Sequence, residues 1–412
     1  TEIWRETIER LQRCRDLQRK ISNGEITHIN DFITYNLDIR QFVQDLLEKT
    51  DDHLFLLHFN EALLKVTILD PTCGSGAFLF AAMNILEPLY ETCVYRMKEF
   101  NEQNPNLFKA NLEELHSRYR SNIQYYIYKT IILHNLYGVD IMHEATEIAK
   151  LRLFLKMVAV VDVDFTADNL GLDPLPDIDF NIRCGNTLVG YATEKQLDID
   201  LQYGDMFANL EFKEKIDTEM QKVAKTFERF RQLQLSQDAE NMQAFKDAKQ
   251  ELNDRLAQLN DLLNRRLYTS TTGNILAKGK EKYNAFLASH QPFHWLAEYY
   301  QIIHGNGGFD VIIGNPPYVS MADISYLKNS DVFRCSDLYG FVIKRVFEIL
   351  RRSGKHGFVV MHNLAFSRNF KDVRKLLLSH VGSQWYSFYS RIPSGLFSGD
   401  VRVRNCIYIV SN

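Results

Sequence analysis

The chain has 412 residues, of which 45% are hydrophobic and 24% are charged, so it can bury a large core and is predicted to hold one large domain with additions. The formal net charge of −4 excludes a protein that binds nucleic acid through an overall basic field. Residues 341–412 are the exception, with 12 Lys and Arg against 3 Asp and Glu, so we expect a polyanion to contact this region.

The six cysteines lie far apart, and none has the Cys-X-X-Cys or Cys/His spacing of a metal site. This pattern is typical of a reduced, cytoplasmic chain without structural zinc, and we expect no metal. No run approaches the roughly 18 apolar residues of a membrane span, and the N-terminus lacks a signal-peptide pattern. We therefore expect a cytoplasmic protein without membrane contact.

Helical periodicity dominates residues 1–49, which we interpret as an N-terminal helical segment. Apolar residues between 2 and 21 recur at helical spacing, and Asn23-Gly24 is predicted to close that helix. Thr34 or Asn36 is predicted to cap a second, short helix.

A glycine-rich turn, DPTCGSG at 70–76, follows the first predicted strand at 65–69 and leads into an apolar helix. Strand, glycine turn and helix are the order that a nucleotide-type site needs, because glycines let the ligand approach the backbone and the helix N-terminus offers unpaired amides. The absence of Gly-Lys-Ser/Thr excludes a phosphate loop, and a missing third glycine argues against a dinucleotide. Asp70 would repel a pyrophosphate but suits a cation, which favours S-adenosylmethionine.

Two further predicted strands end in side chains that suit a nucleoside. The strand at 136–141 carries Asp140, and a carboxylate at this tip commonly binds ribose hydroxyls; capping of the next helix is the alternative. The strand at 178–184 leads to Asn186, which could bond adenine or only form a Gly-Asn turn. We assign 50–193 to the cofactor half of the domain, with a helical insertion at about 84–133.

Between 194 and 294 the alternation of strands and helices disappears. Apolar residues step by three and four from Met220 to Phe230 and again from Phe245 to Leu263, which predicts a helical hairpin insertion with coiled-coil-like seams. Its charges are mixed in sign, which is typical of solvated faces; a role in reading DNA is the alternative.

The strand predicted at 309–313 stops abruptly in Gly-Asn-Pro-Pro-Tyr. The two prolines fix the backbone and lack N–H groups, so their carbonyls and the Asn315 amide are preset acceptors beside the ring of Tyr318. A flat ring that carries an amine would fit this corner. The strands and helices that follow complete a catalytic half at 295–412 and predict an α/β fold, a mostly parallel doubly wound sheet with an antiparallel C-terminal edge.

The ordered motifs ILDPTCGSGAFL, LYGVDI, NIRCGNTL and FDVIIGNPPYV resemble those of the gamma-type N6-adenine DNA methyltransferases of bacterial restriction-modification and phage-defence systems. The resemblance covers residues 30 to 412 apart from the two helical insertions. It implies a Rossmann-like class I fold that binds S-adenosylmethionine and methylates an adenine flipped out of double-stranded DNA.

The resemblance also implies roles for particular residues. The catalytic corner matches Asn315, Pro316, Pro317 and Tyr318, and the cofactor contacts match Thr34, Asp70, Thr72, Gly74, Gly76, Asp140, Ile141 and Asn186. Tyr318 and Phe397 would sandwich the target base, although packing of Phe397 in the core is the alternative. Two positions depart from the family pattern: Asn186 replaces a more frequent Asp, and only Thr34 of a usual Thr-Pro-Pro is kept.

Other functions remain possible on the same residues. Asn-Pro-Pro-Tyr corners also serve methyltransferases of RNA guanine or protein glutamine, and a subunit could hold cofactor and recognise DNA without turnover. Methylation of cytosine C5 needs a thiolate, commonly in a Pro-Cys pair, and no proline here precedes a cysteine. Family members usually carry a recognition domain after the catalytic one, so we expect a recognition domain or subunit, and any nuclease, elsewhere in the full-length protein or system.

Overall fold

The computed structural model describes residues 4–119, 122–163, 165, 175–203, 205–235, 242–273, 280–320, 335–379, 382–392, 395–397 and 403–411. Within these ranges, seven strands form one sheet in the order β3-β2-β1-β4-β5-β7-β6. They are β1 (Ile68–Asp70), β2 (Leu136–Asp140), β3 (Ile182–Cys184), β4 (Phe309–Gly314), β5 (Leu350–Met361), β6 (Ser383–Tyr389) and β7 (Asn405–Ser411). The first five are parallel and β7 is antiparallel to both of its neighbours, which confirms the predicted sheet.

The central strand β1 is shorter than predicted and begins later. The helix α4 (His53–Lys65) starts at its N-cap Asp52 and continues through Lys65, so the chain is extended only from Val66 onward. The Thr67 amide and hydroxyl both donate to Asp310 Oδ2 at 2.9 Å, and this pair joins the start of β1 to the start of β4. A carboxylate therefore replaces one rung of the backbone ladder at this end of the sheet.

Helices cover both faces of the sheet, as a doubly wound fold requires. One face packs on α4, α5 (Ala77–Gln103), α7 (Ile123–His134) and α8 (His143–Val158), and Ile68 lies in that core. Leu69 faces the other core, which is built on α13 (Trp295–Glu298), α14 (Leu338–Ile349) and α16 (Lys371–Leu378). Residues 84–103 continue the helix that begins at Ala77 instead of starting a separate one, and α6 (Lys109–Arg118) follows.

The N-terminal region forms α1 (Trp4–Ser22), α2 (Ile29–Thr34) and α3 (Ile39–Lys49). The prediction that Thr34 or Asn36 caps a helix was wrong. His28 caps α2 with a reciprocal bond to Asp31, and Asp38 caps α3 through Arg40 N and Gln41 N. Thr34 instead ends α2, and Asn36 adopts a positive φ of 54° in the turn between the two helices.

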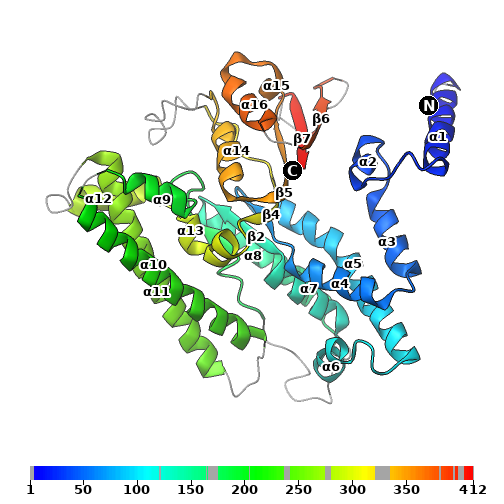
Figure 1. Ribbon diagram of the computed structural model, residues 1–412, viewed down its shortest axis with the longest axis horizontal. Coiled ribbons are helices and arrows are strands. Elements are labelled where there is room, and N and C mark those ends of the chain that lie inside the picture. The colour runs from blue at the N-terminus through cyan, green and yellow to red at the C-terminus, as the bar shows by residue number, and fades with distance from the viewer. Residues whose placement is uncertain are drawn as a thin grey trace.

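The region predicted as a helical hairpin contains the long helices α10 (Met206–Leu235) and α11 (Met242–Thr272), which lie side by side next to the sheet (Figure 1). The seam is buried at Met220, Val223, Phe230, Ala248, Leu252, Leu256, Leu259 and Leu263. The short helix α9 (Glu194–Asp200) precedes the hairpin and α12 (Lys280–His290) follows it.

A five-residue π-helix, η4 (Gln301–Gly305), follows α13 and leads into β4. Beyond β5, the short helices α15 (Asn363–Phe366) and η6 (Arg368–Phe370) precede α16. In the part of the chain that the structure describes, no helix is long and apolar enough to cross a membrane.

Candidate active site

The turn after β1 places a buried carboxyl group beside a glycine-lined backbone. Asp70 is only 1% exposed, and its Oδ1 accepts the Thr72 amide at 3.0 Å. Gly74 and Gly76 have φ of 50° and 80°, the left-handed region that favours glycine. A Cβ on Gly76 would also lie 3.0 Å from the Cβ of Ala149, so glycine lets α5 start against α8. Gly76 is the N-cap of α5 and has no side chain to occupy the first amides of that helix.

The Asp70 carboxyl group has a raised pKa, so its charge can change near neutral pH. Burial, assisted by the nearby charge of Asp140, raises the pKa of Asp70 to about 8, although the bond from the Thr72 amide opposes the rise. The group is therefore largely protonated at neutral pH in the cofactor-free protein. A cation placed beside it would favour the ionised form, which is the behaviour expected of a group that meets an ammonium.

Asp140, at the tip of β2, is tied to the same turn. Its Oδ2 accepts the Gly74 amide at 2.8 Å and its Oδ1 accepts the Met142 amide at 2.9 Å. Met142, not Asp140, is the N-cap of α8, so Asp140 forms a turn before the helix and does not cap it. Each oxygen keeps a second lone pair for another donor. Ile141 follows with 42% of its surface exposed, next to this carboxylate.

The segment that follows β3 also packs against the turn after β1. The Thr187 hydroxyl donates to the Pro71 carbonyl, which brings Asn186 to the turn after β1. Asn186 is 4% exposed and its Oδ1 accepts the Leu188 amide at 3.1 Å, so the predicted Gly-Asn turn is present. Asn186 Nδ2 and Thr72 Oγ1 are buried and have no hydrogen-bond partner among the residues that the structure describes. Such orphaned groups are costly in a folded protein and fit a site that a polar ligand completes.

The residues around the turn after β1 fit S-adenosylmethionine in their chemistry. The carboxyl group of Asp70 could meet an ammonium, the Asp140 carboxylate has lone pairs that could accept from ribose hydroxyls, and the buried Asn186 amide could donate to a ring nitrogen. These groups lie at the carboxyl ends of β1 and β2 and in the segment after β3. In open α/β sheets ligands bind outside the carboxyl ends of the strands.

The Asn-Pro-Pro-Tyr corner begins at the carboxyl end of β4, directly beside Asp70. A Cβ on Gly314 would lie 2.6 Å from Asp70 Oδ1, so the missing side chain permits this approach. Pro316 is buried and Asn315 is exposed. The Tyr318 hydroxyl lies 2.8 Å from Asn315 Oδ1 and 3.1 Å from the Val359 carbonyl.

Asn405, at the start of β7, is a member of this corner that the sequence analysis missed. It is 1% exposed, and its Nδ2 donates to the Tyr318 hydroxyl at 3.3 Å. Burial raises the pKa of Tyr318 to about 12, although the bond from Asn405 opposes the rise. An asparagine at the head of the apolar run CIYIV is the one signal in the sequence that could have identified it.

Two predicted residues form no hydrogen bond or ring contact with the corner or the cofactor turn in the part of the chain that the structure describes. The Thr34 hydroxyl donates to the Asn30 carbonyl at 3.1 Å and accepts from Trp385 Nε1 at 3.1 Å, on the edge strand β6. That strand lies four positions from β1, or about 19 Å at ~4.8 Å per strand. Phe397 is partly buried in a loop, and among the described residues no ring contact joins it to Tyr318.

A doubly wound sheet with a glycine turn after β1, a carboxylate at the tip of β2 and an Asn-Pro-Pro-Tyr corner after β4 defines a Rossmann-like methyltransferase fold. The chain belongs to the Eco57I restriction-modification methylase family, whose model matches residues 134–390. The model of the MmeI DNA-methyltransferase domain matches residues 46–193.

Relatives of known name are similar to this chain over part of their length. A putative type II restriction enzyme and methyltransferase of Methanocaldococcus jannaschii is 28% identical over 93% of this chain and 32% of its own. The type II restriction enzyme and methyltransferase RM.Eco57I of Escherichia coli is 27% identical over 33% of this chain and 12% of its own. The solved structure of the type IIL restriction-modification enzyme MmeI in complex with DNA aligns with a TM-score of 0.40 and 14% identity, over 90% of this chain and 34% of that one. The chain thus spans between 12% and 34% of the length of these relatives.

Proposed function

We propose that this chain transfers a methyl group from S-adenosylmethionine to the N6 amine of an adenine flipped out of double-stranded DNA. The reaction would protect host DNA in a restriction-modification or phage-defence system. The observation that carries the proposal is the approach of the Asn315 corner to Asp70 across Gly314, where a Cβ would lie 2.6 Å from the carboxyl oxygen. A carboxyl group that can bind a cation and an amide that can accept hydrogen bonds from an amine then lie side by side, at the carboxyl ends of β1 and β4.

The chemistry needs acceptors because the lone pair of an adenine amine is delocalised into the ring. The Asn315 side-chain oxygen and the Pro316 carbonyl would each accept one N–H of that amine. The nitrogen would then be biased toward a tetrahedral shape, and its lone pair could point at the methyl group. This is catalysis by positioning and electrostatics, without a covalent intermediate on the protein.

The cofactor would be held by the residues around the turn after β1. S-adenosylmethionine, when bound, supplies an electrophilic methyl group on a sulfonium. Asp70 would meet its ammonium, Asp140 its ribose hydroxyls, and Asn186 Nδ2 a ring nitrogen of its adenine, while Thr72, Gly74 and Gly76 would line the backbone approach. Ile141, exposed beside Asp140, would cover one face of the adenine.

The target base has to leave the duplex, since its amine is otherwise paired. Tyr318, whose ring is partly buried, would stack on one face of the base, and we assign the other face to Phe397. Aromatic stacking of this type contributes about 1 to 3 kcal/mol per base. The surplus of Lys and Arg in residues 341–412 supports contact with the phosphates. Recognition of a DNA sequence, and cleavage, would belong to further domains or subunits.

The decisive experiment expresses the full-length gene in cells and maps methylated bases by long-read sequencing. We expect N6-methyladenine at one sequence motif with the wild type, and none with Asn315→Ala. Asn84→Ala, on an exposed position of α5, serves as the matched control and should methylate as the wild type does.

Purified Asn315→Ala should still bind S-adenosylmethionine in calorimetry, because Asn315 is assigned to the acceptor and not to the cofactor. Wild-type levels of N6-methyladenine with Asn315→Ala would overturn the assignment of the corner. Methylation of cytosine, RNA guanine or protein glutamine by the wild type, without methylated adenine, would overturn the choice of substrate.

A further inference from the structure

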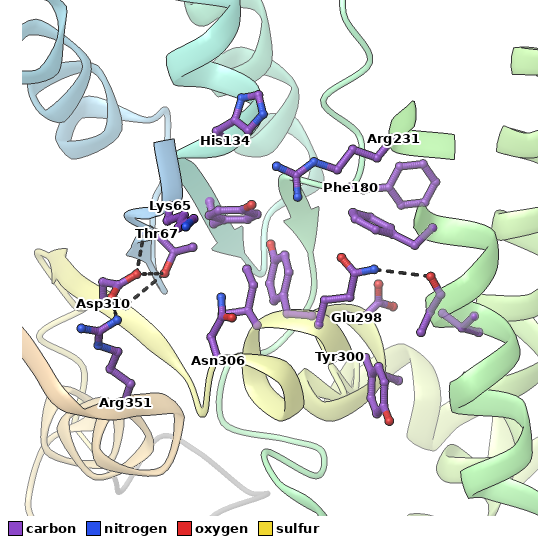
Figure 2. A pocket seen from close by; sticks show the side chains of 18 of the residues that line it. Lys65, Thr67, His134, Phe180, Arg231, Glu298, Tyr300, Asn306, Asp310 and Arg351 are labelled. Atoms are coloured by element: carbon purple, nitrogen blue, oxygen red, sulfur yellow. Dashed lines mark hydrogen bonds and ion pairs between the residues drawn. The ribbon is translucent and has the colours of Figure 1, made fainter. Parts of the chain in front are cut away.

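A cavity of about 490 Å³ lies at the edge of the sheet opposite the proposed active site (Figure 2). Its lining includes Lys65 and Thr67 before β1, His134 before β2, and Asp310 at the start of β4. The helical hairpin contributes Arg231 and other residues of α10. The cavity therefore lies between the hairpin and the amino ends of these strands. Its volume is typical of small-molecule sites in proteins.

The charged groups of the cavity leave a positive surplus. Arg351 pairs with Asp310, and Glu298 pairs with Arg183, so these charges are matched. Lys65 and Arg231 line the same cavity and form no hydrogen bond or ion pair with any residue that the structure describes. In Figure 2 the Arg231 guanidinium extends from α10 into the space between His134 and Phe180. Two cations without partners in one concave site attract an anion.

A third polar group faces this space without adding charge. His134 Nδ1 lies 3.0 Å from the Thr130 carbonyl, so this nitrogen carries the proton and Nε2 is free to accept a bond. Burial, together with the charge of Arg231, lowers the pKa of His134 to about 4, and the ring is neutral at physiological pH. The anion-binding charge is therefore that of Lys65 and Arg231 alone.

Aromatic rings form the apolar part of the lining: Tyr137, Phe180, Phe227, Tyr299 and Tyr300. Within the described ranges the Tyr137 hydroxyl has no hydrogen-bond partner, whereas the Tyr299 hydroxyl donates to the Asn181 carbonyl at 2.9 Å. Flat ring surfaces with a free hydroxyl suit a planar ligand that also carries polar edge atoms.

The backbone beside the cavity is unusual as well. Gln301 and Ile302 of the π-helix η4, and Asn306 just after it, belong to the lining. A π-helical turn is less stable than an α-helical one and occurs frequently at functional sites. Its position at this cavity is a second, independent indication of a ligand site.

We propose that this cavity binds a flat aromatic anion of mononucleotide size, with its anionic group between Lys65 and Arg231 and its ring against the aromatic lining. The ligand would contact both the hairpin and the amino ends of β1 and β4, the two strands whose other ends carry Asp70 and Asn315. The site is separate from the proposed methyl-transfer site and does not depend on that function.

Calorimetry on the whole chain tests the proposal, with adenosine monophosphate as the probe and saturating S-adenosylhomocysteine present to fill the cofactor site. We expect one nucleotide bound per chain. Arg231→Gln and Lys65→Gln should each weaken binding at least about tenfold, because each removes a charge-assisted contact. Arg231→Lys should weaken it less. The matched control is Arg229→Gln on the same helix, an exposed residue that pairs with Glu251 at 3.7 Å, and it should bind as the wild type does.

Adenosine and inorganic phosphate separate the two parts of the ligand, and each should bind more weakly than adenosine monophosphate. Adenosine that binds as tightly would overturn the role of the anion, and phosphate that binds as tightly would overturn the role of the ring. The proposal also fails if there is no binding at ~1 mM nucleotide, or if S-adenosylhomocysteine displaces the nucleotide. Unchanged affinity in a folded Arg231→Gln, confirmed by its melting curve, would overturn it as well.

Discussion

The Tyr318 hydroxyl lies 2.8 Å from Asn315 Oδ1, so the group assigned to the acceptor amine is in contact with the ring assigned to the target base. The same hydroxyl has the Val359 carbonyl at 3.1 Å and accepts a bond from Asn405. A hydroxyl has a single hydrogen, so only one of its two acceptors receives it at a time. The corner is thus anchored to β5 and β7 through one oxygen atom.

Tyr318→Phe should lower kcat for methyl transfer about fivefold without changing the Kd of the cofactor, because Asn315 loses a bond worth about 1 kcal/mol that orients its amide. The variant also leaves the buried Asn405 amide without a partner, at a cost of about 1 to 3 kcal/mol in the free energy of unfolding. Tyr339→Phe is the control, since its hydroxyl bonds Asn363 at 2.5 Å and does not contact Asn315. A kcat equal to that of the wild type in Tyr318→Phe would remove the orienting role.

Cofactor affinity should depend on pH through Asp70. With a pKa of about 8 in the free protein, the carboxyl group must lose its proton to meet an ammonium, so binding releases a proton below pH 8. We expect Kd to rise by up to about tenfold from pH 7 to pH 6. Asp70→Asn should bind more weakly at pH 7.5 and show little dependence on pH, as calorimetry in buffers of different ionisation enthalpy would reveal. A dependence that survives in Asp70→Asn would assign the proton to another group.

The raised pKa of Asp70 has the opposite effect on stability: a higher pH favours cofactor binding but lowers the free energy of unfolding. Because the folded pKa of Asp70 lies above the unfolded value of 3.8, the cofactor-free protein loses stability as pH rises from 3.8 through about 8. Asp70→Asn removes the ionisation and keeps an oxygen to accept the Thr72 amide. Its melting temperature should therefore exceed that of the wild type at pH 8 and the difference should shrink at pH 5. An equal difference at both values would contradict this.

The ribose role of Asp140 can be separated from its role in the turn. Asp140→Ala should weaken cofactor binding at least tenfold, but loss of the bond to the Gly74 amide could alone disturb the turn. A 2′-deoxy analogue of S-adenosylhomocysteine resolves the two effects in a double-mutant cycle. The wild type should bind the 2′-deoxy analogue more weakly than S-adenosylhomocysteine. Asp140→Ala should bind the two ligands with equal affinity. Additive losses would leave Asp140 with the structural role only.

Gly314→Ala should be destabilising and should weaken cofactor binding, since a methyl group would lie 2.6 Å from Asp70 Oδ1 and 3.1 Å from the ring of Phe358. Overpacking of this kind costs about 1 to 3 kcal/mol in the free energy of unfolding. Gly305→Ala is the control, because nothing lies within 4 Å of its added Cβ. Chemical denaturation of both variants measures the difference, and equal midpoints would show that the site tolerates a side chain.

Much of the sheet could be predicted because its strands are apolar runs that stop at a glycine or a carboxylate, as at Asp140 and Gly314. The start of β1 could not, since α4 continues through Lys65, while Asp310, 243 residues after Thr67, holds Thr67 in the extended chain. Local periodicity contains no information on such a distant carboxylate.

The sequence placed Asp70 and Asn315 at strand ends, and the structure has them at the carboxyl ends of β1 and β4. Asn405 was missed because its role depends on the pairing of β7 beside β5, which places it within reach of Tyr318. Thr34 was matched through a single threonine, and the helix that it ends packs on the distant edge strand β6. The opposite cavity could not be predicted, because its cations come from α4 and α10, which meet only in the folded chain.

The pairing of β1 with β4 also affects how the chain folds during its synthesis on the ribosome. Ile68 pairs with Val311, and 243 residues separate the neighbouring pair Thr67 and Asp310. At ~5 to 20 residues per second of synthesis, β1 waits about 12 to 50 s for this neighbour. The α10–α11 hairpin has its contacts closer in sequence and can form during that interval. Nascent chains should therefore keep one hydrogen-bonding edge of β1 unpaired, and accessible to chaperones, until β4 leaves the ribosome.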